Sequence, residues 1–138
     1  MKEITRRFCG LTILSIPAIL YGGIFLLSFL TGAIPEGEWT DFQHTMFRAG
    51  HAHAGVLILF SLVALFFSDY AQLSDVGLWM IRIGFPISAI LISGGFFLSA
   101  LGDGITQPNG LIVILYLGIG LLVLSLLTLG IGLVKKAP

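Results

Sequence analysis

Residues 111–134 read LIVILYLGIGLLVLSLLTLGIGLV and contain no charged side chain. A helix needs about 20 apolar residues to cross the roughly 30 Å of hydrocarbon in a bilayer. Within that hydrocarbon only helices and closed barrels satisfy their backbone groups, and this run lacks the apolar–polar alternation of a barrel strand. The stretch therefore predicts a transmembrane helix.

Three further apolar runs lie upstream and extend this prediction to the whole chain. The four predicted helices cover residues 8–34, 43–69, 79–102 and 110–134. Of the 138 residues, 57% are hydrophobic and 10% are charged, whereas about a quarter are charged in a soluble domain. We expect one all-α membrane domain, residues 1–138, with four transmembrane helices arranged as two hairpins. A cleaved signal peptide is the alternative for the first run, although that run is long for one and no A-x-A site follows it.

The basic residues are distributed unevenly between the two ends of the predicted helices, and lysine and arginine favour the cytoplasmic side. All but one of the seven fall at one end: Lys2, Arg6, Arg7, Arg82, Lys135 and Lys136. The other end carries Arg48 and the acidic residues Glu36, Glu38, Asp41 and Asp103. The sequence therefore predicts an integral membrane protein with both termini in the cytoplasm, and we expect the plasma membrane of a bacterium.

The first and third predicted helices share a glycine pattern. With an offset of 72 residues, Gly22-Gly23 aligns with Gly94-Gly95. The match is consistent with a parallel 2+2 repeat, or with the ease of aligning any two glycine-rich helices. Because small residues let membrane helices approach closely, we expect a tight bundle that forms a homo-oligomer or packs against another membrane subunit.

All three histidines of the chain, His44, His51 and His53, lie in or beside the motif RAGHAHAGV. At 100° per residue His44, Arg48 and His51 share one helix face, whereas His53 lies about 200° away from His51. Ionisable side chains in membrane helices are costly and therefore indicate function, although these fall near the outer boundary of the hydrocarbon. The alternative is a structural role, in which the interleaved small residues pack against a neighbouring helix.

A transition metal ion such as copper or zinc is one candidate ligand of this segment. The candidate metal ligands are His44, His51, His53 and Asp103. His44 and His51 are about 10 Å apart along a helix axis, so they share one ion only if His44 belongs to a loop that folds back, and a carboxylate or a residue of a neighbouring chain would then complete the site. Arg48 is expected either to pair with Asp103 or to bind an anion, such as a haem propionate, as a bidentate donor.

The segment FRAGHAHAGVLILF, residues 47–60, resembles the histidine-bearing helices of the haem–copper oxidase and nitric oxide reductase superfamily. In that family an H-x-H pair ligates two haems, one on each side of its helix. The resemblance covers one helix and implies haem binding by His51 and His53, completed by a symmetric partner. The family's haem–copper centre needs histidines from several helices, and this chain has none outside the second predicted helix. Oxygen or nitric oxide reduction is therefore not implied.

The sequence leaves three functions open. The first is binding of haem or a transition metal at the extracytoplasmic end of the second helix, in electron transfer, sensing or cofactor handling. The second is a non-catalytic scaffold or accessory subunit that packs through glycine-rich helix faces, and the third is an oligomeric transporter or channel. A net charge of zero disfavours nucleic acid as a partner. No phosphate loop, nucleophile elbow or H-E-x-x-H motif is present, so the sequence favours a non-enzymatic role without deciding it.

Overall fold

The computed structural model describes residues 1–33 and 39–135, and its regular structure there is entirely helical. The helices are α1 (Glu3–Leu14), α2 (Ile16–Leu30), α3 (Asp41–Ser68), α4 (Asp75–Ser99) and α5 (Ile112–Val134). Because α1 and α2 follow one another within a single span, the described residues contain four segments that are long and apolar enough to cross a membrane. The prediction of an all-helical chain with four such segments is confirmed.

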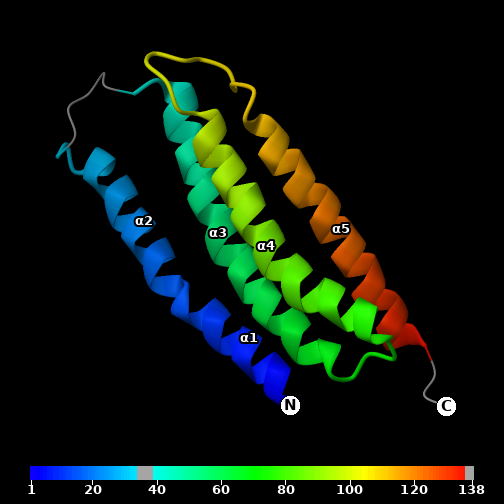
Figure 1. Ribbon diagram of the computed structural model, residues 1–138. Coiled ribbons are helices and arrows are strands. Elements are labelled where there is room, and N and C mark those ends of the chain that lie inside the picture. Colours follow the sequence, from blue (N-terminus) through cyan, green and yellow to red (C-terminus); the bar gives the residue numbers. More distant parts are fainter. Residues whose placement is uncertain (34–38, 136–138) are drawn as a thin grey trace.

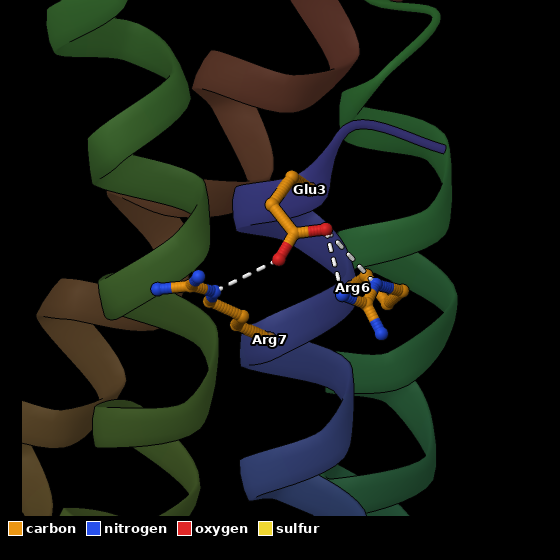
Figure 2. Close-up of polar contacts among 3 residues, drawn as sticks. All are labelled: Glu3, Arg6 and Arg7. Carbon is orange, nitrogen blue, oxygen red and sulfur yellow. Dashed lines mark hydrogen bonds and ion pairs between the residues drawn. The ribbon is translucent and has the colours of Figure 1, made fainter.

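The first span differs most from its predicted bounds of 8–34. It begins at Glu3, so that Arg6 and Arg7 lie within α1 rather than before it. Glu3 pairs with both arginines, at 2.7 Å from Arg6 Nη2 and 3.0 Å from Arg7 Nε, and Figure 2 shows the two guanidinium groups on opposite sides of it. All three side chains are exposed, so these pairs contribute little to stability.

The same span is interrupted at Ser15, between α1 and α2. Pro17 explains the break, because proline has no amide hydrogen and its ring clashes with the carbonyl group four residues earlier. The Ser15 amide and hydroxyl both donate to the Thr12 carbonyl oxygen, which closes the end of α1. The sequence contained this signal, since Pro17 lies in the middle of the first apolar run.

The helices lie side by side, with α3 between the first span and α4, and with α4 between α3 and α5 (Figure 1). The contact between α4 and α5 is close because glycines meet the opposite helix. A Cβ atom at Gly95 would lie 2.5 Å from the Leu115 amide nitrogen, and one at Gly118 would lie 2.8 Å from the Ile92 nitrogen. Small residues therefore bring these two backbones together, as they do in many membrane helix pairs.

The beginning of α3 is tied to the loop between α4 and α5. Thr40 and Gln43 form a capping box, in which the Thr40 hydroxyl accepts from the Gln43 amide and the Gln43 side chain accepts from the Thr40 amide. The buried Gln43 side chain also donates to the carbonyl oxygens of Ala100 and Gly102, at 3.0 and 2.8 Å. These bonds fix the end of α3 that carries the histidines.

The packing of the first span is looser towards the histidine end. α2 contains no buried residue, whereas α4 buries residues along its whole length, among them Ile81, Phe85 and Ile92. In a bilayer the exposed apolar side chains of α2 would contact lipid. α2 therefore forms only a lightly packed wall beside α3.

Candidate functional site

A cavity of about 590 Å³ lies between α2 and α3, close to the end of the molecule that carries the histidines. It is lined by Leu26, Phe29 and Leu30 of α2 and by Asp41, His44, Thr45, Arg48 and His51 of α3. We refer to this space as the α2–α3 crevice. Its volume falls within the roughly 300–1,000 Å³ of typical ligand sites, and it combines apolar walls with a few polar groups.

His51 lies against the glycine pair of α2. A Cβ atom at Gly23 would lie 3.2 Å from His51 Cε1 and 3.3 Å from Nε2, and one at Gly22 would lie 3.6 Å from Nδ1. The absence of side chains at Gly22 and Gly23 therefore makes room for the imidazole ring. Among the described residues, the ring nitrogens of His51 make no hydrogen bond, so both remain available to a ligand.

His44 and Arg48 line the crevice on the same face of α3 as His51, at the spacing that a helical period brings together. The His44 ring packs edge-to-face on Phe29, with 4.8 Å between ring centroids. Arg48 is exposed, and within the described parts of the chain its guanidinium group forms no ion pair. Among the described residues, the crevice thus holds two imidazoles, the Asp41 carboxylate and one guanidinium group that forms no ion pair.

His53 lies on another side of α3, away from the crevice. Its Nδ1 is 2.8 Å from the Ala49 carbonyl oxygen of the preceding turn, and its ring packs on Phe96 of α4 at a centroid distance of 4.8 Å. His51 and His53 therefore face α2 and α4 respectively. One ligand cannot contact both histidines within a single chain.

The four candidate metal ligands do not gather at one point. Asp103 is exposed in the loop between α4 and α5, and this loop is tied to the Gln43 side of α3, whereas Arg48 faces α2. The expected Arg48–Asp103 ion pair is accordingly not formed. In residues 1–33 and 39–135, no group of three or more His, Cys, Asp or Glu side chains could hold a metal ion. Glu36 and Glu38, the other acidic residues expected near Arg48, lie outside the described residues.

Arg82 forms a second polar site, which the sequence reasoning missed. Arg82 was counted with the basic residues at the ends of the predicted helices, but it lies inside α4 and is only 5% exposed. Its Nη2 donates to the Thr5 hydroxyl at 3.3 Å and lies 3.9 Å from Asp69 Oδ1. The Thr5 hydroxyl in turn donates to Asp69 Oδ1 at 2.7 Å. A lone arginine with apolar residues on both sides was the signal that could have indicated a buried cation with a distant partner.

Asp69 is the acidic member of this Thr5–Asp69–Arg82 network. Burial alone raises the pKa of its carboxyl group. The hydrogen bonds from the Thr5 hydroxyl and the Lys2 amide, together with the positive charges of the N-terminus and Lys2, outweigh that effect and leave the pKa below its usual value. Asp69 is therefore charged at neutral pH, and the network connects α1, the end of α3 and α4.

Comparison with protein-family models, with curated proteins and with solved structures gave no match to this chain.

Proposed function

We propose that the α2–α3 crevice binds haem, with a histidine on the iron and Arg48 on a propionate. The observation that supports this proposal is the crevice itself, in which His44, His51 and Arg48 line one cavity with apolar walls. A flat apolar ring with carboxylate groups at one edge matches that combination. Arginine binds carboxylates as a planar, bidentate donor, which suits it to the propionate.

The donor set fits haem better than a bare metal ion. Protein sites for zinc take three or four ligands from side chains. The described residues supply no such group, as the scattered positions of His44, His53 and Asp103 illustrate. Haem iron needs only one or two axial ligands from the protein, because the porphyrin supplies the others. We therefore propose haem rather than copper or zinc.

His51 is the better axial ligand of the two crevice histidines. It lies deeper along α3, and the absence of side chains at Gly22 and Gly23 makes room for its ring. His44 lies nearer the beginning of α3 and is already packed on Phe29. Since the two are about 10 Å apart along the helix, they do not bind one iron together, and a second axial ligand would come from another copy of the chain.

Membrane orientation follows from the basic residues in this proposal. Arg82 no longer counts toward the charge bias, because it is buried and paired. Lys2, Arg6, Arg7 and Lys135 remain at one end, and Lys136 lies outside the described residues. Figure 1 draws the beginning of α1 and the end of α5 at that same end. The bias still favours a cytoplasmic location for this end. The four spans then form two helical hairpins, and the haem site lies on the extracytoplasmic side. Its role there would be electron transfer, sensing or cofactor handling.

The test is an optical titration of the detergent-purified chain with hemin. We expect a Soret band that saturates as hemin is added and that is lost in His51→Ala. The matched control is His53→Ala, which removes an imidazole from the same helix but on the side of α4, and which should leave the band unchanged. Protein that stays spectrally silent with hemin, or a band that depends on His53 rather than His51, would overturn the assignment.

A further inference from the structure

A second cavity, of about 230 Å³, lies between α1 and α4 near the end opposite the histidines. We call it the α1–α4 groove. Its walls are mostly apolar and include Phe8 and Leu11 of α1 and Ile83, Ile87 and Ile90 of α4. Leu11 and Ile90 are 65% and 62% exposed, so the groove opens sideways to the surrounding lipid.

One buried polar group lines this groove without a partner. Arg82 contributes to its wall, and the Nε atom of Arg82 is buried and has no hydrogen-bond partner among the described residues. The other end of the same guanidinium group is occupied, because Nη2 contacts Thr5 and Asp69. Leaving a buried charged group without a hydrogen-bond partner costs free energy. This cost points to an acceptor supplied by a bound molecule. Asp69 already balances the charge of Arg82, so a neutral acceptor such as an ester carbonyl fits here.

A positively charged side chain of α1 lies one helical turn from the groove. Arg7 lies one helical turn before Leu11 on the same face of α1, and its guanidinium group reaches back to Glu3. Glu3 neutralises only one of its two arginine partners, so the group drawn in Figure 2 keeps a net positive charge. Phe8 packs edge-to-face on Trp79 at 5.8 Å, and tryptophan is common at the membrane–water interface.

We propose that the α1–α4 groove binds one anionic glycerophospholipid. Its phosphate contacts Arg7, an ester carbonyl accepts a hydrogen bond from Arg82 Nε, and an acyl chain lies along Leu11, Ile87 and Ile90. This order of phosphate, ester and acyl chain is the order found with increasing depth in a bilayer leaflet, and it fits because Arg7 reaches towards the end of α1 while Arg82 lines the groove. Basic pockets between membrane helices on the cytoplasmic side commonly bind anionic head groups. This inference does not depend on haem binding at the α2–α3 crevice.

The test is lipid binding to the detergent-purified chain, measured by native mass spectrometry and by thermal shift. The probes are phosphatidylglycerol, phosphatidylcholine and a membrane quinone. We expect one tightly held phosphatidylglycerol per chain and at least about tenfold weaker binding of phosphatidylcholine, because the choline cation balances the phosphate charge and is repelled by the net positive charge of Glu3, Arg6 and Arg7. Equal retention of both phospholipids, or preference for the quinone, would overturn the proposal.

Three variants separate the contribution of the lipid head group to binding from that of the acyl chain. Arg7→Gln should weaken phosphatidylglycerol binding about tenfold. Arg6→Gln is the matched control, because it removes the same charge from the other side of Glu3 and should change binding less than about twofold. Ile87→Trp should fill the groove and abolish binding without touching the Thr5–Asp69–Arg82 network. Equal effects of Arg6→Gln and Arg7→Gln, or full binding by Ile87→Trp, would contradict the site.

Discussion

The two glycine pairs, Gly22-Gly23 in α2 and Gly94-Gly95 in α4, occupy aligned positions in the sequence but meet different neighbours. Gly95 lies against the backbone of Leu115, so that α4 and α5 are in direct contact. Gly23 meets only the imidazole ring of His51. A small residue permits close approach but does not decide what approaches. The side chains of the facing helix decide whether the space is taken up by backbone or by a ring.

The two regions are also held together differently. The α4–α5 contact is distributed along both helices through several small residues. The first span is held mainly at one end, where the Thr5–Asp69–Arg82 network lies, while α2 buries nothing. Polar bonding at one end and small-residue packing along the length are therefore two separable sources of stability in this chain.

Asp69→Ala should have the largest effect, because it leaves the buried Arg82 without its carboxylate. Breaking a buried pair in this way costs about 3 kcal/mol. We expect faster hydrogen–deuterium exchange throughout α1 but little change in α5, measured in detergent by mass spectrometry. Asp75→Ala is the control, since Asp75 is an exposed carboxylate in the first turn of α4. Uniform destabilisation of α1 and α5 alike would mean that the two regions are not separable.

Gly95→Ala should destabilise the contact between α4 and α5 rather than the attachment of the first span. Its new methyl group would lie 2.5 Å from the Leu115 nitrogen, so the backbones of α4 and α5 must move apart. Overpacking of this kind costs about 1–3 kcal/mol, which equilibrium unfolding in mixed detergent micelles can detect. Gly94→Ala is the control in the same helix, since nothing lies within 4 Å of its added carbon. Equal stability of these two variants would refute the close-contact account of α4–α5.

Acidification should detach the first span from α3 and α4, with a smaller loss of stability than Asp69→Ala or Gly95→Ala. The lowered pKa of Asp69 adds stability that is present above the unfolded-state pKa of about 4 and is lost as pH falls through the folded-state value. Exchange in α1 should therefore accelerate in strongly acidic solution before exchange in α5 does. Asp69→Asn should remove most of this pH dependence, and an unchanged profile in that variant would assign the transition to another group.

Gly23→Ala should have the smallest effect on stability, within about 0.5 kcal/mol of the parent chain. The added carbon would lie 3.2 Å from His51 Cε1, and an imidazole can rotate where a backbone cannot. Hemin titration of the same variant should nevertheless change, because the ring that we propose as axial ligand has shifted. A stability loss comparable to that of Gly95→Ala would show that Gly22-Gly23 and Gly94-Gly95 serve the same purpose.

Much of the fold followed from hydropathy, because apolar runs long enough to cross a bilayer leave few alternatives. The predicted bounds of the later spans lie within a few residues of α3, α4 and α5. The break at Ser15 was missed because length and hydropathy do not show where a backbone amide hydrogen is lacking. Pro17 marks that position in the sequence. Arg82 was misassigned because a cation near a helix end is normally counted as a flanking charge.

The candidate site was less predictable, since it depends on neighbours that are distant in the sequence. The helical period alone places His44, Arg48 and His51 on one face, which the crevice between α2 and α3 matches. It does not reveal that His51 lies on Gly22-Gly23 or that His53 lies on Phe96. The partners of Arg82 come from α1 and from the end of α3, so no local pattern identifies them.

Gln43 has a kinetic consequence for the α2–α3 crevice. By bonding to the carbonyl oxygens of Ala100 and Gly102, it fixes the α3 wall against the loop between α4 and α5, whereas α2 has no comparable restraint. Segments with few buried contacts open locally at low free-energy cost. The rates of ligand entry and escape would then be set by outward movement of α2. Residence time in the crevice could therefore be tuned through α2 without altering a single group that touches the ligand from α3.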